Sequence, residues 1–272
     1  MKKSGRLSCM AFALLFATSL LAAPARAQAP ANVTVNAFPG GFNWPSFVGQ
    51  QKGFFERNGI TVTLQPTPNS VAQMTGLAEG KFDIAMTAFD NIVAYVEGQG
   101  EAPIGAQPDF FAFMGSDNGF LRLVVAPDVK RFADLKGKTL SVDVRTTGYA
   151  FVLFEVLRRN GLAENNYKIE KVGETGQRWD ALRDRKQTRT LLSAPFNILA
   201  SEQHFNQLAK ATKVIGRYQG NVAATRRTWA RENGTKLIAF IRGYAQAIDW
   251  VYDKANRDEA HHDSAEQCPN VP

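Results

Sequence analysis

The segment FDIAMTAFDNIVAY, residues 82–95, places three small polar side chains between two apolar runs. Thr87 ends the first run, and Asp90 and Asn91 precede the second, which follows a different period. Such side chains cap helices by accepting hydrogen bonds from the first N–H groups. They can also hold a ligand, because helix N-termini favour acceptors and anions. The sequence predicts that Asp90 or Asn91 caps a helix and leaves ligand contact as an alternative.

The same combination of residues recurs at three other places along the chain. The stretches FPGGFNWPSF, VRTTGYAF and SAPFN follow predicted strands at 33–38, 139–144 and 188–193. Each stretch sets small or hydroxyl residues beside an aromatic side chain, the mixture from which ligand pockets are built. Ordinary turn chemistry explains any one stretch alone. Their repetition in both halves favours a shared pocket, at the carboxyl ends of parallel strands.

The elements that must position these residues alternate between strand and helix. Strands are predicted at 33–38, 60–66 and 82–87, each followed by helical spacing, with Gly80 ending the helix that Asn69 or Ser70 begins. A second strand–helix series covers 139–193, and an apolar helical pattern returns at 238–251. Strand–helix alternation predicts parallel sheets covered by helices. Two α/β lobes are the simplest arrangement.

The N-terminal 27 residues have the features of a secretory signal peptide. Lys2, Lys3 and Arg6 precede an apolar run, and APARAQA offers small residues at cleavage spacing. Removing residues 1–27 lowers the formal charge from +7 by the four positive charges Lys2, Lys3, Arg6 and Arg26, to +3. No basic stripe with interleaved aromatics remains, so nucleic acid is not an expected partner. One cysteine, Cys268, remains, which excludes an internal disulfide; we expect a periplasmic monomer.

The sequence favours neither a metal site nor catalytic machinery. The residue types that bind zinc occur together near the C-terminus, at His261, His262, Asp263 and Cys268. However, adjacent histidines point in different directions, and this segment has no apolar period. Asp180, Asp184 and the arginines around them resemble a solvated helix face. We therefore expect no metal, no cofactor and no catalytic residue.

Four longer segments resemble one known family. They are GFNWPSFVGQQKGFFERNGITVTLQPTPNS, GLAEGKFDIAMTAFDNIVAY, FADLKGKTLSVDVRTTGYAFVLFEVLRRNGL and YQGNVAATRRTWARENGTKLIAFIRGYAQAIDWVYD. They are similar to periplasmic solute-binding proteins of ABC importers, of the nitrate, sulfonate and taurine, or thiamine-precursor type. The resemblance implies a type II periplasmic-binding-protein fold, with two lobes of mostly parallel sheets flanked by helices. It places lobe 1 at 31–119 and 216–260, and lobe 2 at 120–215.

The resemblance also implies which residues hold a ligand between the lobes. The family's ligand loops fall on GFNW, TAFDN, RTTGY and SAPF. Thr146 and Thr147 would face a polar head, Arg145 would neutralise an anion, and aromatic side chains would cover the apolar part. The expected binding residues are Asn43, Trp44, Thr87, Asp90, Asn91, Arg145, Thr146, Thr147, Tyr149 and Phe196.

Several functional alternatives remain open at this stage. The leading expectation is a non-catalytic protein that delivers a sulfonate, pyrimidine or aromatic acid to an ABC permease. A ligand sensor for a membrane receptor and an enzyme related to thiamine-pyrimidine synthases are the alternatives. The tail at 261–272 departs from the family pattern, which predicts either a truncated or frame-shifted gene or a divergent, disordered tail.

Overall fold

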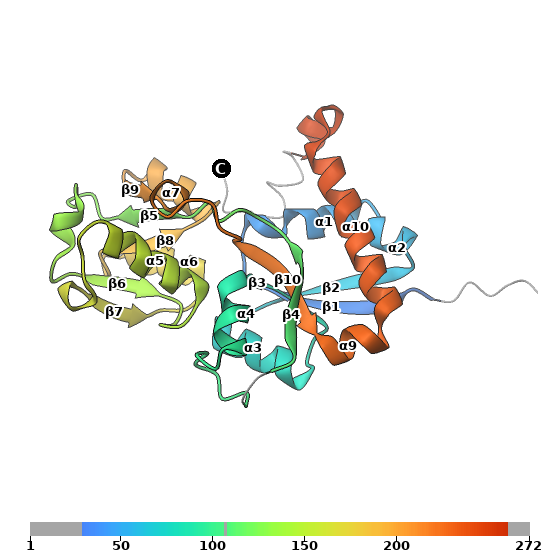
Figure 1. The fold of residues 1–272 in the computed structure, drawn as a ribbon. Helices are drawn as coiled ribbons and strands as arrows, with labels where there is room; N and C mark the ends of the chain where they lie inside the picture. The colour runs from blue at the N-terminus through green and yellow to red at the C-terminus, as the bar shows by residue number, and fades with distance from the viewer. Residues whose placement is uncertain (1–28, 106–107, 261–272) are drawn as a thin grey trace, which may run out of the picture.

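The computed structural model describes residues 29–105 and 108–260. These ranges do not include the predicted signal peptide at 1–27 or the tail at 261–272. The residues considered above for zinc binding, His261, His262, Asp263 and Cys268, lie in that tail. Two five-stranded sheets form the centres of two lobes (Figure 1). The first has the strand order β2-β1-β3-β10-β4 and the second has the order β7-β6-β8-β5-β9. The predicted two-lobed α/β fold is therefore confirmed.

The bounds of the strands follow in chain order. They are β1 Ala31–Ala37, β2 Ile60–Pro66, β3 Ile84–Ala88, β4 Phe110–Gly115, β5 Arg122–Val125, β6 Thr139–Val142, β7 Lys168–Lys171, β8 Arg189–Leu192, β9 Asn206–Lys210 and β10 Asn221–Arg226.

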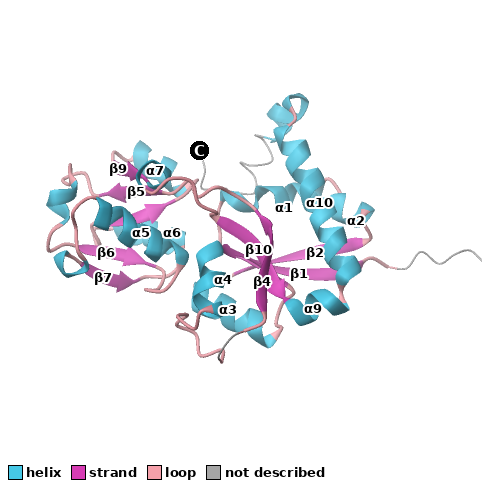
Figure 2. Ribbon diagram, in the orientation of Figure 1, coloured by secondary structure: helices cyan, strands magenta, loops and turns pink. Residues whose placement is uncertain are grey.

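The α-helices flank both sheets (Figure 2). They are α1 Trp44–Gln51, α2 Phe54–Arg57, α3 Ser70–Glu79, α4 Phe89–Val96, α5 Gly148–Arg159, α6 Thr175–Arg183, α7 Phe196–Glu202, α8 Ala211–Val214, α9 Arg227–Glu232 and α10 Gly234–Tyr252. Short 3-10 helices lie at Gly41–Asn43, Phe132–Leu135, Glu164–Asn166 and Lys254–Asn256.

Each sheet contains one reversed strand. β1 is parallel to β2 and β3, whereas β10 is antiparallel to both β3 and β4, so four strands of the first sheet share one direction. In the second sheet, β5 is likewise antiparallel to both of its neighbours, β8 and β9. Each reversed strand directly follows a crossover between the sheets, at 116–121 or at 215–220. The lobe boundaries expected near 120 and 215 fall in these crossovers and stay a prediction.

The core of lobe 1 covers both faces of its sheet. On one face, Phe55 of α2 stacks on Phe240 of α10 with ring centroids 5.6 Å apart. A Cβ at Gly49 or Gly243 would lie within 2.6 Å of the Phe55 ring, so glycine lets these helices approach. On the other face, α3 and α4 bury Met74, Leu77 and Ile92.

Helix caps fix where α3 and α5 begin. Asn69 Oδ1 accepts a hydrogen bond from the Ala72 N–H at 2.8 Å, and Gly80 ends α3 in the left-handed conformation, as predicted. Thr147 caps α5 through a longer hydrogen bond of 3.4 Å from the Ala150 N–H. Both caps lie at the cleft side of their lobes, so they position the site.

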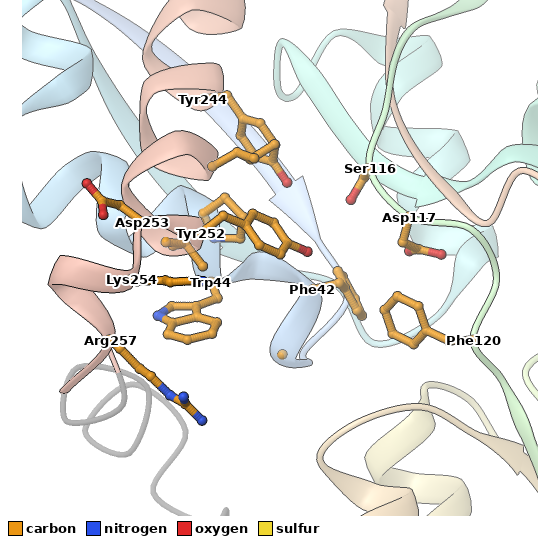
Figure 3. Close-up of a pocket in the computed structure, with 14 residues that line it drawn as sticks. Phe42, Trp44, Ser116, Asp117, Phe120, Tyr244, Tyr252, Asp253, Lys254 and Arg257 are labelled. Carbon is orange, nitrogen blue, oxygen red and sulfur yellow. The ribbon is translucent and has the colours of Figure 1, made fainter. Parts of the chain in front are cut away.

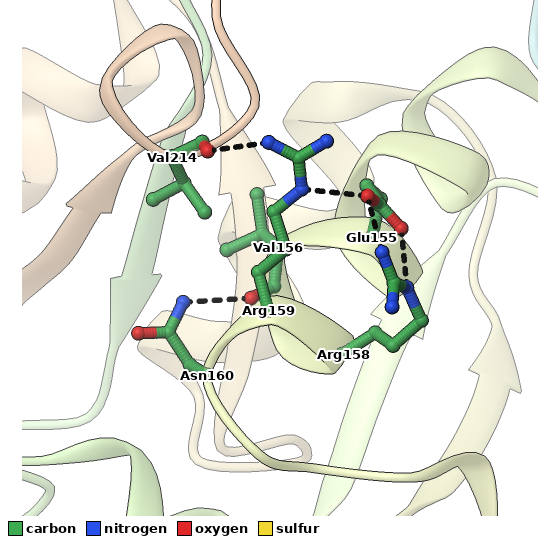
Figure 4. A network of polar contacts seen from close by, with 6 residues as sticks. All are labelled: Glu155, Val156, Arg158, Arg159, Asn160 and Val214. Atoms are coloured by element: carbon green, nitrogen blue, oxygen red, sulfur yellow. Dashed lines mark hydrogen bonds and ion pairs between the residues drawn. The ribbon is translucent and has the colours of Figure 1, made fainter.

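The C-terminal end of α5 carries a network of charged side chains (Figure 4). Glu155 accepts hydrogen bonds from Arg158 Nε at 2.7 Å and from Arg159 Nε at 2.6 Å. The two guanidinium groups hold the pKa of the partly exposed Glu155 carboxyl at about 2. Arg159 Nη1 also donates to the Val214 carbonyl at 2.9 Å, at the end of α8. The network thus ties α5 to the start of the second crossover.

Candidate ligand-binding site

A small cavity lies between the lobes, where three of the four expected loops meet. It is lined by five residues from each lobe: Phe38, Phe42, Ala88, Asn91 and Asn221 from lobe 1, and Asp143, Thr147, Tyr149, Thr175 and Arg178 from lobe 2. We call it the inner cavity. Its free volume of about 20 Å³ is enough for a single water molecule. The lobes are therefore closed on one another.

The N-termini of α4 and α5 face each other across this cleft. Asn91 Nδ2 donates to Thr87 Oγ1 at 3.0 Å, which orients the Asn91 side chain. Asn91 Oδ1 then accepts from the backbone N–H of Gly148, the first residue of α5, also at 3.0 Å. Asn91 thereby satisfies one of the free N–H groups at the start of a helix in the other lobe.

Asp90 and Gly148 are in close contact in the same place. A Cβ on Gly148 would lie 1.7 Å from Asp90 Oδ1 and 2.8 Å from the Ala88 Cβ, so only glycine allows this approach. Burial raises the pKa of Asp90 to about 6, although a hydrogen bond from its own backbone N–H acts in the opposite direction. An acid with this pKa titrates within the range in which many proteins work.

The prediction that Asp90 or Asn91 is the N-cap of α4 is wrong. The N-cap is Ala88, and no side chain caps this helix. The Phe89 N–H instead donates to the carbonyl of Gly220 at 2.8 Å, in the second crossover. A backbone acceptor from the crossover takes over the capping role, which leaves Asp90 and Asn91 to contact lobe 2.

A second hydrogen bond across the cleft runs in the opposite direction, from a helix N-terminus of lobe 1 to a side chain of lobe 2. Asp143 follows β6 and its Oδ2 accepts from the N–H of Ser70, the first residue of α3, at 2.9 Å. Its Oδ1 is buried and has no hydrogen-bond partner among the residues described. Burial raises the pKa of Asp143, and the charge of Arg178 partly opposes this. Asp143 therefore offers the inner cavity an unused acceptor.

Arg178 is the main buried cation of the site and is only 2% exposed. Its guanidinium donates to the hydroxyl oxygens of Thr190 and Thr175, at 3.1 Å each, and to the Gly173 carbonyl at 2.9 Å. A fourth, longer bond of 3.5 Å goes to the Leu191 carbonyl. An arginine has five N–H donors. One donor therefore remains for the inner cavity, which Arg178 lines.

Tyr149 supplies a second polar group to the cavity. Its ring lies under the Arg178 guanidinium, 5.7 Å from the ring centroid, and its hydroxyl accepts a long 3.5 Å hydrogen bond from Asn221 Nδ2. Burial raises the pKa of Tyr149 to about 12, so the hydroxyl keeps its proton and can donate it to a ligand. The inner cavity thus holds both donors and acceptors.

A larger apolar pocket shares Phe42 with the inner cavity, and Figure 3 shows the residues that line it. We call it the outer pocket; its volume is about 470 Å³. Its walls come from the start of α1, the crossover at 116–121 and the C-terminal half of α10. Trp44 lies in this wall beside Lys254, and its buried Nε1 has no acceptor among the described residues.

The structure places the expected binding residues in three different surroundings. Asn91, Thr147 and Tyr149 line the inner cavity, with Thr87 and Asp90 directly behind them. Asn43 is buried in its own loop, where its Nδ2 donates to the Phe38 carbonyl at 2.7 Å. Trp44 lines the outer pocket instead.

Arg145, Thr146 and Phe196 do not line either space. The Arg145 side chain reaches Glu164 at 3.5 Å, and its backbone N–H donates to the Glu101 carboxylate of lobe 1 at 2.7 Å. Phe196 packs with Trp179 and Leu192 in a small cluster of lobe 2.

Sequence reasoning missed Asp143, Thr175, Arg178 and Asn221 as lining residues. The interpretation of the 178–185 region as a solvated face holds for Arg183, which pairs with exposed Asp180 at 2.9 Å. It is wrong for Arg178, because α6 turns this side chain toward the sheet and its buried hydroxyls. The available signal for Asp143 was a lone acid at the end of an apolar strand.

The described residues hold neither a metal cluster nor a membrane-spanning helix. No group of three or more His, Cys, Asp or Glu side chains within 29–105 and 108–260 is arranged to hold a metal ion. In the same ranges no helix is long and apolar enough to cross a membrane.

Comparisons with known proteins agree with this architecture. The structure resembles the periplasmic nitrate-binding protein NrtA from Synechocystis PCC 6803, with 12% identity, coverage of 89% of this chain and 67% of that one, and a TM-score of 0.77. It also resembles the periplasmic aliphatic sulphonate binding protein SsuA from Escherichia coli, with 16% identity, 89% and 80% coverage, and a TM-score of 0.68.

A third similar structure is the ligand-binding component of an ABC-type import system from Staphylococcus aureus, with 14% identity, 86% and 84% coverage, and a TM-score of 0.66. These likenesses show the fold. No curated protein sequence matches the chain. The family model described as NMT1/THI5 like matches residues 43–258, which is most of the chain. The chain therefore belongs to the NMT1/THI5-like family.

Proposed function

We propose that the protein is the periplasmic substrate-binding component of an ABC importer, which captures a small organic molecule between its lobes. The observation that carries the proposal is the inner cavity, to which both lobes contribute polar groups. Asp143 Oδ1 is unused, and Arg178 and Tyr149 keep donors. Sites that bind small molecules place a few such groups among apolar walls.

Capture would proceed by a hinge motion of the two lobes. The crossovers at 116–121 and 215–220 are the connections between the sheets. The free volume of the inner cavity is too small for an organic ligand, so a ligand must enter while the lobes are further apart. A ligand that contacts both lobes favours the closed arrangement by its differential affinity.

The charges around the cavity bear on the ligand class. Two carboxyl groups, Asp90 and Asp143, lie at the helix N-termini that would otherwise attract an anion. Both have raised pKa values because burial disfavours their ionised form. This arrangement favours a molecule that both donates and accepts hydrogen bonds, such as a pyrimidine, over a simple anion such as nitrate. Sulfonates and aromatic acids are still candidate ligands and are included in the binding experiment below.

Export would come before ligand capture, and delivery to the membrane would follow it. Residues 1–27 would direct the chain to the periplasm and be removed. The permease subunits in the membrane would then recognise the closed form. The proposal assigns the chain no reaction, and its site residues bind the ligand without chemical change.

The test is thermal unfolding of residues 28–272, alone and with taurine, other sulfonates, nitrate, pyrimidines and aromatic acids. A ligand at a hundred times its dissociation constant stabilises a binding protein by about 2.7 kcal/mol. We expect one chemical class to raise the Tm, with pyrimidines ahead of nitrate. If no compound in the panel moves the Tm, the assignment as a binding protein for these classes fails.

A variant with a matched control separates cleft binding from binding elsewhere. Gly148→Ala adds a Cβ that collides with Asp90 and Ala88 across the cleft, so the ligand-induced rise in Tm should largely disappear. Gly234→Ala changes the first residue of α10, where an added Cβ meets nothing within 4 Å. That control should keep the full ligand response. An equal response in both variants would place the ligand outside the cleft.

A further inference from the structure

The loop that follows α4 holds an acidic side chain against lobe 2. Figure 1 shows α4 on the side of lobe 1 that faces lobe 2. In this loop, Glu101 Oε1 accepts a hydrogen bond from the backbone N–H of Arg145 at 2.7 Å, and Glu101 Oε2 pairs with Lys171 Nζ at the end of β7. The backbone N–H of Thr146 also favours the ionised form of this carboxylate. One side chain of lobe 1 therefore contacts three groups of lobe 2.

The chain on both sides of Glu101 is fixed to α4. The Ala102 N–H donates a hydrogen bond to Tyr95 Oη at 3.1 Å, and Ala102 itself is buried. A Cβ at Gly100 would lie 2.1 Å from the Tyr95 ring, so glycine lets the loop pass closely over that ring. The Glu101 carboxylate is thus already positioned by lobe 1, and its contacts with lobe 2 order little additional backbone, which would cost conformational entropy.

The contacts of Glu101 are stronger than those of an ordinary surface ion pair. An exposed pair contributes little, and Lys171 is 53% exposed. The Glu101 side chain, however, is only 22% exposed, and hydrogen bonds from N–H groups to a carboxylate are charge-assisted. Burial acts to raise the pKa of Glu101, but Lys171 and the backbone N–H groups outweigh it and lower that pKa. The carboxylate is therefore ionised at neutral pH and attracts all three groups.

The stretch that Glu101 contacts was expected from the sequence to face the polar head of a ligand. The backbone N–H groups of Arg145 and Thr146 instead act on Glu101, so the anion at this loop is part of the chain. Slightly further along the same stretch, the Gly148 N–H donates to Asn91 of α4. Lobe 1 therefore occupies the start of α5 at two points with its own acceptors.

We propose that Glu101 is a latch that holds the two lobes closed whether or not a ligand lies in the inner cavity. Its carboxylate belongs to the chain, so its contacts form each time the lobes close and are lost each time they open. The latch shifts the open–closed equilibrium equally for every ligand, and the residues of the inner cavity decide which ligand adds to that shift. An anion that uses the N–H groups of Arg145 and Thr146 must first displace Glu101.

Small-angle X-ray scattering of residues 28–272 without added ligand tests the latch. Glu101→Gln keeps the size of the side chain and removes the charge that Lys171 and the N–H groups contact. We expect a larger radius of gyration in this variant, because a greater share of the molecules has open lobes. Lys171→Met removes only the charged partner and should give a smaller increase. If both variants scatter like wild type, the proposal is overturned.

Glu97→Gln is the matched control, at the end of α4. Glu97 is exposed and makes no ion pair or side-chain hydrogen bond within residues 29–105 and 108–260, so its variant should scatter like wild type. An equal increase in the control would mean that net charge sets the separation of the lobes, which also overturns the latch. Circular dichroism identifies a variant that has lost its fold. Lys171→Met alters an exposed side chain and carries the test in that case.

Ionic strength distinguishes the ion pair from the backbone contacts. Raising the salt concentration from about 0.1 M to about 1 M shortens the Debye length from roughly 10 Å to roughly 3 Å. The radius of gyration of wild type should then rise toward that of Lys171→Met and stay below that of Glu101→Gln. If Glu101→Gln responds to salt as strongly as wild type does, the response comes from other charges and the latch is overturned.

Discussion

The two ends of α5 make opposite uses of polar side chains. At the N-terminal end, Gly148 and Tyr149 are buried against Asn91, Asp90 and Arg178, with single hydrogen bonds that join the lobes. At the C-terminal end, Glu155 binds two arginines in an exposed network. The second end has shorter contacts, yet water competes for them and salt screens them. Burial, and not the number of ionic contacts, should decide which end matters.

The largest expected effect comes from removing the buried cation at the N-terminal end. Arg178→Leu leaves two threonine hydroxyls and the Gly173 carbonyl without their donor, and Asp143 without its compensating charge. We expect the free energy of unfolding to fall by about 3 kcal/mol or more, measured by urea denaturation.

The control for this prediction is Arg183→Leu, on the same helix. Arg183 is exposed and pairs with Asp180, so its loss should cost less than about 1 kcal/mol. Equal losses for the two arginines would show that burial does not distinguish the regions.

The next effect is a pH dependence that arises from Asp90. Its pKa is about 6 in the folded protein and 3.8 in the unfolded chain, so the folded state binds the proton more tightly. The contribution to stability is present below pH 4 and is lost as pH rises through 6. We expect a loss of at most about 3 kcal/mol across this window.

Asp90→Asn isolates that contribution. The amide does not titrate, so the difference in unfolding free energy between wild type and variant should change between pH 4 and pH 6 and be constant above. If the difference in unfolding free energy does not change between pH 4 and pH 6, Asp90 is solvated. The N-terminal end of α5 would then be open to water.

The smallest effect is expected at the C-terminal end of α5. Glu155→Gln removes the charge that both arginines contact, but the site is exposed. We expect a Tm within about 2 °C of wild type at physiological salt, measured by differential scanning calorimetry. A larger drop would show that the Arg159 contact to Val214 stabilises the second crossover more than its exposure suggests.

Much of the fold could be predicted from local pattern. The strand at 60–66 and the helix from Asn69 to Gly80 follow from alternation and from capping chemistry within a few residues. β9 and β10 were not assigned. β10, with the sequence NVAATR, is short and buried on both faces, so it lacks the alternation that marks a half-exposed strand. Its place depends on β3 and β4, which are distant in sequence.

The candidate site could be predicted only in part. The stretches at 87–91 and 146–149 were found because acceptors and hydroxyls follow strands, and the structure brings Asn91, Thr147 and Tyr149 to one cavity. The burial of Arg178 was not predicted, because a helix with charges of both signs has the pattern of a solvated helix. Only the position of the sheet under α6 shows that this side chain is buried. Phe196 and Arg145 have the right residue types in a loop of the right kind, but their side chains point into lobe 2 or along its surface.

The sequence by itself determined the two α/β lobes, most of their elements and the loops beside the cleft, because periodicity, capping and turn residues act over a few positions. Only the tertiary structure decided that Asn91 meets Gly148, that Arg178 is buried, and that Phe42 lines both the inner cavity and the outer pocket. It also decided which face of α10 the core covers. These outcomes depend on contacts between segments far apart in the chain, which no local pattern encodes.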